Sequence, residues 1–143
     1  MTLLRIPASI AVLACLLVSV PFGARAAVTE DQFVARTAGD LAALCSADPS
    51  DPLYTAAVNF CHGFGAGTYG VLSEIENANP KVRLFCAPQV QPTRNEVVAA
   101  FVSWTHAQPA RAAMPAVDGV AAFLADTYPC PKPASRPASR RTS

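Results

Sequence analysis

The sequence predicts a small all-α domain, a bundle of four main helices stapled by two disulfide bonds. Apolar residues recur at steps of three, four and seven along four segments, which is the spacing of one helical face. Threonine capping boxes and prolines mark the ends of these segments. The number of cysteines left after removal of an expected leader is even, which is typical of a disulfide framework. No segment alternates strongly enough to indicate a strand.

The first residues of the chain are typical of a secretory signal peptide. One positive side chain occurs in Met1–Arg5, an apolar run spans Ile6–Val20, and Ala24-Arg25-Ala26 offers a small-x-small cleavage site. The apolar run is shorter than the roughly 20 residues that span a bilayer comfortably, and no second run of that length follows. We therefore expect cleavage near Ala26, export from the cytoplasm and no stable membrane insertion afterwards.

Composition divides the chain into three parts. Residues 1–26 are the expected signal peptide, residues 27–130 a helical disulfide-bonded domain, and residues 131–143 a Pro/Ser/Arg-rich tail expected to be disordered. Between Ala27 and Cys130, five Lys/Arg stand against ten Asp/Glu, a net charge of −5. Because nucleic-acid binding needs clustered cations that face phosphates, we expect no nucleic-acid partner.

The first helix is expected from Thr29 to about Cys45. Thr29 and Gln32 form a capping box at its start, and a turn over residues 46–52 with two Asp-Pro steps follows its end. The apolar residues with helical spacing are Phe33, Val34, Ala38, Leu41 and Leu44.

The second helix is expected over Leu53–Ala78. Its apolar face carries Phe60, Phe64, Val71 and Ile75, and an Asn-Pro step stops it. Gly63 and Gly67 fall on or beside this face. Because glycine costs a helix interior up to about 1 kcal/mol, the sequence predicts that they allow the close approach of a neighbouring helix.

Two shorter helices complete the bundle. Thr93 and Glu96 form a capping box that starts the third helix, which ends before Pro109. The fourth begins near Met114-Pro115 and ends at Pro129. Their apolar residues follow helical spacing: Val97, Val98, Phe101, Val102 and Trp104, then Val117, Val120, Ala121, Leu124 and Tyr128.

The four cysteines of the domain permit three pairings. Cys45 closes the first helix and Cys61 lies early in the second, so a helical hairpin would bring them together. Cys86 precedes the third helix and Cys130 follows the fourth, and these ends are neighbours in an antiparallel pair. The layout favours Cys45–Cys61 and Cys86–Cys130. Cys15 leaves with the signal peptide, although a weak lipoprotein box ending at this residue keeps lipidation open as a minor alternative.

The sequence offers no catalytic, cofactor-binding or metal-ligating residues. Gly65–Gly70 matches a dinucleotide-binding pattern but lies inside a predicted helix with no preceding strand. Cys61 and His62 are adjacent, so they point about 100° apart and cannot form a nucleophile and base pair. The cysteine gaps are too wide for a zinc module. We therefore expect no enzyme, no cofactor and no metal.

The order of the cysteine signals resembles the Rap/Tai immunity proteins, which protect bacteria against peptidoglycan amidases delivered by type VI secretion. The resemblance covers residues 41–130. Its matching pieces are Leu44-Cys45, Cys61-His62-Gly63-Phe64 with Gly67 beyond, Phe85-Cys86-Ala87-Pro88 and Tyr128-Pro129-Cys130. The resemblance implies an all-helical periplasmic inhibitor with oxidised cysteines that occupies the amidase's substrate groove, and it implies a possible homodimer.

The loop between the third and fourth helices is the contact surface that we expect for a protein partner. A loop braced by rigid helices is where recognition usually resides. The candidate residues are Ala107, Gln108, Pro109, Ala110, Arg111 and Met114.

Two other functions fit the composition. The first alternative is a periplasmic stress chaperone similar to the small helical acid-stress proteins, because ten domain carboxylates would change charge at low pH. Those chaperones typically have one disulfide, whereas this chain offers two. A binder of small apolar ligands is a third possibility, for which the sequence offers no supporting polar constellation.

Overall fold

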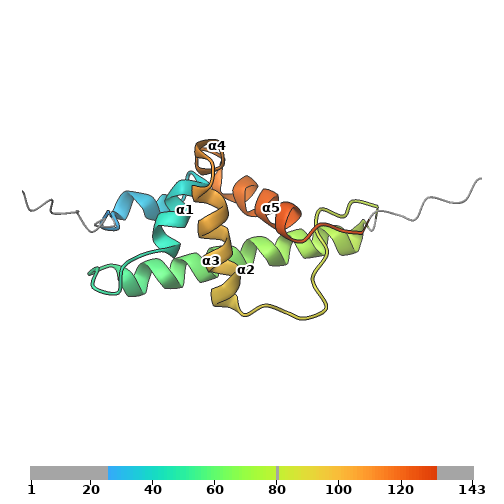
Figure 1. The fold of residues 1–143 in the computed structure, drawn as a ribbon, viewed down its shortest axis with the longest axis horizontal. Helices are drawn as coiled ribbons and strands as arrows, with labels where there is room; N and C mark the ends of the chain where they lie inside the picture. The colour runs from blue at the N-terminus through green and yellow to red at the C-terminus, as the bar shows by residue number, and fades with distance from the viewer. Residues whose placement is uncertain (1–25, 80, 132–143) are drawn as a thin grey trace, which may run out of the picture.

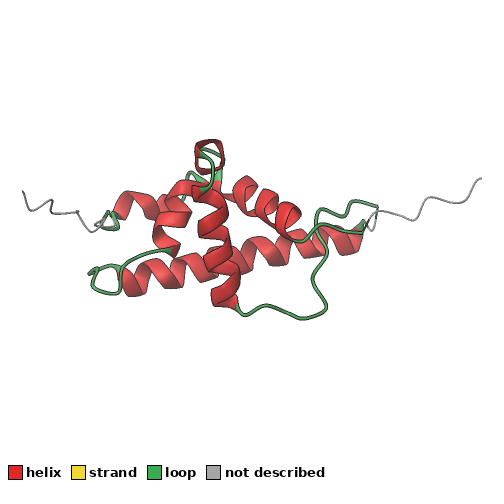
Figure 2. Ribbon diagram, in the orientation of Figure 1, coloured by secondary structure: helices red, strands yellow, loops and turns green. Residues whose placement is uncertain are grey.

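The computed structural model describes residues 26–79 and 81–131, which form helices joined by loops (Figures 1 and 2). The elements are the 3-10 helix η1 (Glu30–Val34) and the α-helices α1 (Ala38–Cys45), α2 (Tyr54–Ala78), α3 (Arg94–His106), α4 (Pro109–Ala112) and α5 (Ala116–Thr127). The predicted all-α class is confirmed. Within the described ranges the one strand-like pairing is an isolated bridge between Thr37 and Pro115. Nearly all of the expected leader and tail lies outside these ranges.

The short helix α1 is the centre of the bundle. It packs against α2, α3, α4 and α5, whereas α2 and α3 barely contact each other. In Figure 1, the long helix α2 follows the long axis of the molecule, and α1 and α5 lie along one side of it. Small and aliphatic side chains allow this central position, because α1 buries Ala38, Leu41, Ala42 and Leu44. Such a composition lets several helices approach one short element closely.

The prediction of one continuous first helix from Thr29 to about Cys45 is wrong. The chain leaves the helical conformation at Ala35, whose φ of 46° lies in the left-handed region, and restarts at Thr37. The Thr37 hydroxyl accepts a hydrogen bond from the Asp40 N–H at 3.1 Å, and the Thr37 N–H donates to the Asp40 carboxylate at 2.9 Å. Because Thr37 caps the start of a new helix, the first helical segment ends as η1 and α1 begins as a second helix.

The other three predicted helices are confirmed as α2, α3 and α5. The loop expected between the third and fourth contains one further helical turn, α4, which begins with proline at its first position. Proline is pre-organised for that position and lacks only an N–H that would have no partner.

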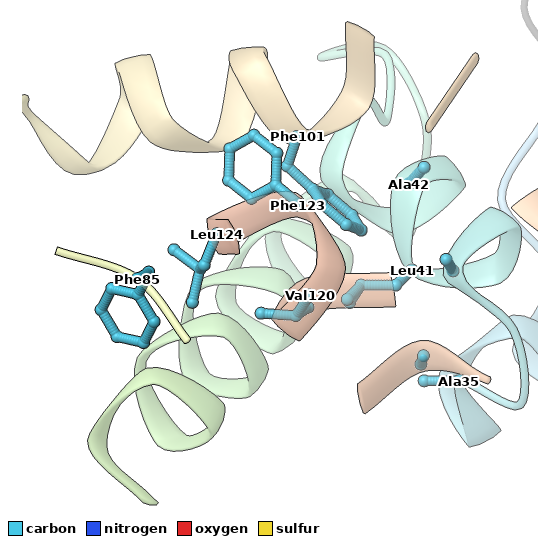
Figure 3. Close-up of a cluster of buried hydrophobic side chains, with 10 residues drawn as sticks. Ala35, Leu41, Ala42, Phe85, Phe101, Val120, Phe123 and Leu124 are labelled. Atoms are coloured by element: carbon cyan, nitrogen blue, oxygen red, sulfur yellow. The ribbon is translucent and has the colours of Figure 1, made fainter. Parts of the chain in front are cut away.

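An aromatic cluster fills the core between α3 and α5 (Figure 3). The Phe123 ring is 2% exposed and meets the edges of its neighbours, with centroids 5.6 Å from Phe101, 6.0 Å from Trp104 and 6.3 Å from Tyr128. Such edge-to-face contacts add to the hydrophobic gain of burial. The buried Thr105 hydroxyl donates to the Phe101 carbonyl at 2.9 Å, so the core keeps no unpaired polar group there.

Both predicted disulfides are confirmed. Cys45–Cys61 joins the end of α1 to the first half of α2, and Cys86–Cys130 joins the loop before α3 to the segment after α5. The two bonds close chain segments of 16 and 44 residues. The first bond ties α2 to the central helix α1, and the second ties the segment after α5 to the loop before α3.

Close helix approach occurs at a different glycine from the two predicted. Among residues 26–79 and 81–131, a Cβ built on Gly63 or Gly67 meets nothing within 4 Å, so neither glycine has the predicted packing role against another described helix. The close approach lies instead at Gly119, where a Cβ would stand 2.5 Å from the Ala38 Cβ. Gly119 thus lets α5 cross α1 at a distance that no larger residue permits.

Opposite effects are expected from two glycine-to-alanine substitutions in helices. Gly119→Ala forces α5 away from α1 and should lower the free energy of unfolding by about 1–3 kcal/mol, the usual cost of overpacking. Gly63→Ala adds a methyl group in open space and should raise it by up to about 1 kcal/mol, because alanine favours the helix. Urea unfolding measures both values. Equal effects of the same sign would contradict the packing described.

Candidate functional site

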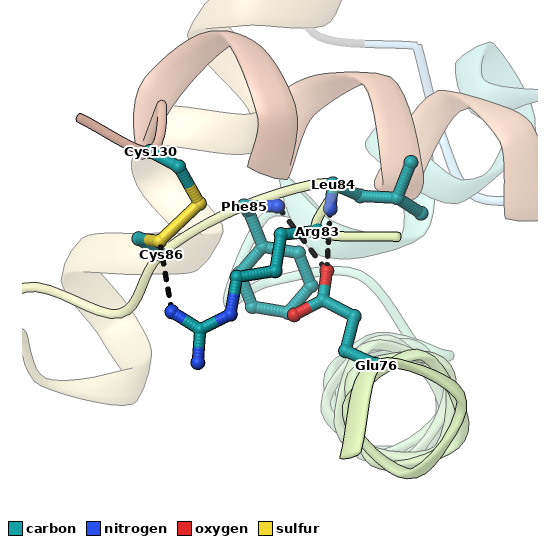
Figure 4. The surroundings of a disulfide bond; sticks show 6 residues. All are labelled: Glu76, Arg83, Leu84, Phe85, Cys86 and Cys130. Atoms are coloured by element: carbon teal, nitrogen blue, oxygen red, sulfur yellow. Dashed lines mark hydrogen bonds between the residues drawn. A yellow bond between two sulfur atoms is a disulfide. The ribbon is translucent and has the colours of Figure 1, made fainter. Parts of the chain in front are cut away.

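A long loop, residues 81–93, leads from α2 to α3, and we call it the strap. Near its middle, the Glu76 carboxylate accepts hydrogen bonds from the N–H groups of Leu84 at 2.7 Å and Phe85 at 3.2 Å (Figure 4). The Phe85 ring is buried in the core cluster. Two backbone donors and one buried ring therefore fix the strap against the end of α2.

The second anchor of the strap is covalent. Cys86 is bonded to Cys130, and its N–H donates to the Tyr128 carbonyl at 2.8 Å. The Arg83 guanidinium lies 3.7 Å from the Cys86 sulfur (Figure 4). The strap is thus held both to α2 and to the segment that follows α5.

A cavity of about 470 Å³ lies under the strap, lined by residues of α1, α2, α3 and α5. The inner surface comes from α1, α3 and α5, with Leu41, Phe101, Phe123 and Leu124 and the Cys45–Cys61 disulfide. Helix α2 contributes small residues, Gly65 and Ala66, and the strap contributes Ala87, Pro88 and Pro92. The cavity is therefore mainly apolar, and its size falls in the range of small-molecule sites.

Five polar side chains line the same cavity: His62, Tyr69, Gln91, Arg94 and, after α5, Tyr128. His62 and Tyr69 come from α2, Gln91 from the strap, and Arg94 from the first position of α3. No carboxylate belongs to the lining, although the domain is acidic overall. Arg94 is the single permanently charged side chain of this lining. Among the described residues its guanidinium has no ion-pair partner.

A capping box positions Arg94 at the start of α3. The Thr93 N–H donates to the Glu96 carboxylate at 2.7 Å and its hydroxyl donates at 2.8 Å. These two hydrogen bonds, first from the backbone and then from the side chain, hold the pKa of Glu96 below its ordinary value. Glu96 therefore stays ionised in mildly acidic solution and keeps the cap intact.

The capping box should make a pH-dependent contribution to stability. Because the folded-state pKa of Glu96 is lowered, the contribution is present above the ordinary carboxyl pKa and is lost as the pH falls through the lowered pKa. An NMR titration of the Glu96 carboxyl carbon measures the shift. Thr93→Ala should raise this pKa part of the way, since the backbone donor stays. An unshifted titration in both proteins would contradict the cap.

The six predicted contact residues lie in one corner of the bundle, residues 107–114, which we call the α4 corner. Ala107, Gln108, Pro109 and Ala110 are exposed, whereas Arg111 and Met114 are half-buried. The corner is anchored by its backbone, because the Met114 carbonyl accepts from the Ala38 N–H at 2.8 Å. Close contact with Gly39 of α1 anchors it further, since a Cβ there would stand 3.1 Å from the Ala112 carbonyl.

Arg111 braces the α4 corner against α3 and α5. Its guanidinium lies 4.4 Å from the centre of the Trp104 ring and donates to the Trp104 carbonyl at 3.1 Å. It also pairs with the Asp126 carboxylate at 3.4 Å, and that carboxylate accepts from the Trp104 indole N–H at 2.9 Å. This closed set of contacts makes the corner a rigid, exposed projection with small side chains at its tip.

Comparison with known proteins identifies the chain. Residues 37–130 match the family of Rap1a immunity proteins. The chain belongs to this family. The match begins at Thr37, the cap of α1, and ends at Cys130, so it includes both disulfides, the strap and the α4 corner. No curated protein and no solved structure matches the chain.

Membership of the Rap1a family confirms the resemblance predicted from the cysteine pattern and indicates an immunity protein that binds a secreted protein effector. The structure also locates the glycine pattern and the two histidines of the sequence. Gly65–Gly70 lies in the interior of α2, and His62 lines the cavity while His106 is exposed at the end of α3. In residues 26–79 and 81–131 no three potential ligand side chains gather into a metal site.

Sequence reasoning missed the anchoring carboxylates of this Rap1a protein. Glu76 holds the strap and Asp126 holds Arg111 and Trp104, yet each contact joins residues eight or more positions apart. No local pattern signals such pairs.

In the described part of the chain, no helix has the length and apolar character needed to cross a membrane.

Proposed function

We propose that the chain is a periplasmic inhibitor that protects its cell by binding and blocking a peptidoglycan amidase delivered by type VI secretion. The observation that carries this proposal is membership of the Rap1a immunity family across both disulfides. The two disulfides support an oxidising compartment, because such bonds persist outside the cytosol. The expected signal peptide supports the same location.

An inhibitor of this kind needs a rigid projection and no chemistry of its own. The α4 corner supplies the projection, because its tip is exposed while Arg111 and the Met114 carbonyl hold its base. A surface that is already ordered loses less conformational entropy on binding. We therefore assign the effector contact to Ala107, Gln108, Pro109 and Ala110, and we assign no enzymatic activity to the chain.

We extend the proposal to a homodimer formed through the outer face of α2. Gly67 and Gly70 leave open space on this helix, and Val71 and Ile75 beside them are 63% and 50% exposed. Glycines and apolar side chains on one face suit the close packing of two helices. Sedimentation equilibrium tests the dimer, and an Ile75→Asp variant should remain monomeric.

Survival of cells that receive the amidase in their periplasm tests the proposed function. Co-expression of the full chain with the amidase encoded beside its gene should restore growth, whereas lysis at the vector-only rate would overturn the proposal. Ala110→Arg places a large cation on the tip of the α4 corner and should abolish protection. Ala56→Arg makes the same change at an exposed position of α2 and should protect like the wild type. Equal protection by both variants would overturn the contact assignment.

A further inference from the structure

We propose that the cavity under the strap is a binding site for a small amphiphilic carboxylate, a molecule with an apolar body and one anionic head. This site goes beyond the proposed inhibition, because the cavity residues and the exposed tip of the α4 corner are different residues.

The apolar body follows from the lining. Phe101, Phe123, Leu124 and Phe85 face a cavity of about 470 Å³ together with Leu41 and the Cys45–Cys61 disulfide. The aromatic and leucine side chains among them are buried and form an apolar floor, whereas Tyr69, Gln91 and Arg94 of the same lining are exposed. A site of this volume with aromatic and aliphatic walls buries most of a small ligand's surface.

The charges of the cavity lining indicate that the head of the ligand is anionic. Arg94 is the one permanently charged side chain of the lining, and no carboxylate lines the cavity in a domain with ten acidic residues. Its guanidinium has no ion-pair partner among the described residues, and the Gln91 amide, which donates one hydrogen bond to the Pro88 carbonyl at 3.5 Å, has a second N–H in the same lining. A carboxylate would be held there by charge-assisted hydrogen bonds, which are stronger than those to a neutral head.

The space is maintained by the fold. Small residues on α2 leave it open, since a Cβ on Gly65 would meet nothing within 4 Å. The opposite wall does not depend on the ligand, because Glu76 and the Cys86–Cys130 bond fix the strap. The pocket is therefore pre-formed, and a ligand loses little affinity to ordering of the protein.

Gly65 and Gly63 offer a matched pair of variants on α2. Leucine at either position meets no neighbouring atom within 4 Å of its Cβ, but only Gly65 lines the cavity. Gly65→Leu should therefore fill the pocket without disturbing the fold, whereas Gly63→Leu adds the same side chain outside it. Circular dichroism and urea unfolding confirm that both variants fold.

Titration calorimetry with dodecanoate below its micellar concentration tests the site in the oxidised, exported chain. We expect saturable binding of one dodecanoate per chain, at least tenfold tighter than that of dodecyltrimethylammonium. Gly65→Leu should weaken dodecanoate binding at least tenfold, and Gly63→Leu should bind like the wild type. Absence of saturable binding, or equal binding by the two leucine variants, would overturn the proposal.

The anionic head has its own test. Arg94→Gln should weaken dodecanoate binding about tenfold and leave binding of the neutral dodecanol unchanged, as expected for the loss of one charge-assisted contact. Arg36→Gln is the control, because Arg36 pairs with Asp31 on the surface outside the cavity. If Arg94→Gln and Arg36→Gln bind dodecanoate equally well, the assignment of the head to Arg94 is wrong.

Discussion

Replacing both Cys86 and Cys130 by alanine is expected to lower the free energy of unfolding by about 4 kcal/mol. The bond closes a segment of 44 residues, and its removal restores that entropy to the unfolded chain. The loss is large for this domain, since proteins of its size are stable by only about 5–15 kcal/mol. The strap should also loosen, because Glu76 and the Phe85 ring become its main remaining anchors.

Urea unfolding of the oxidised proteins measures this loss. The comparison is the Cys45→Ala/Cys61→Ala variant, which opens a segment of 16 residues and should lose about 3 kcal/mol from chain entropy, plus the packing of the buried Cys61 sulfur. A loss below about 1 kcal/mol for the Cys86 and Cys130 pair would show that the bond does not constrain the fold.

Phe123→Ala is the single substitution with the largest expected effect, a loss of about 3–5 kcal/mol. Its ring is fully buried and touches the rings of Phe101, Trp104 and Tyr128, so truncation leaves a cavity that rigid neighbours cannot fill. Because Phe123 also lines the pocket under the strap, the void would join that pocket.

Val117→Ala on the same helix is the control for Phe123→Ala. Val117 is 51% exposed, so its truncation should change the free energy of unfolding by less than about 0.5 kcal/mol. Thermal or urea unfolding compares the two variants. A loss at Phe123 no larger than the loss at Val117 would contradict the core described.

Local signals in the sequence predict most of the fold. Capping residues, proline stops and helical spacing define α2, α3 and α5, and the helix layout leads to the correct cysteine pairing. The first helix fails because apolar spacing runs without interruption through the break at Ala35. The signal that was overlooked is the capping pair Thr37 and Asp40, in which aspartate takes the place of the usual glutamate or glutamine.

Features that depend on which helix covers which face cannot be predicted from one sequence. The periodicity of α2 marks Gly63 and Gly67 as packing positions, yet no other helix in the described part of the chain reaches them, and the close approach falls at Gly119. The cavity also depends on how the helices pack together. It is lined by residues of α1, α2, α3, α5 and the strap, and no local residue pattern specifies that these segments meet there.

The sequence alone predicts only part of the chemistry of the site. The α4 corner could be proposed because a loop between helices is a common place for recognition, and its bracing by Arg111, Trp104 and Asp126 appears only in three dimensions. His62 and Arg94, which lie 32 positions apart in the sequence, line one cavity for the same reason.

Titration of the purified amidase effector with the oxidised, exported chain tests the proposed inhibition. Release of peptide from peptidoglycan should fall in proportion to added protein and reach zero near one chain per enzyme, as for a tight blocker of the substrate groove. Full amidase activity in the presence of a several-fold molar excess of folded protein would show that the chain does not block this enzyme.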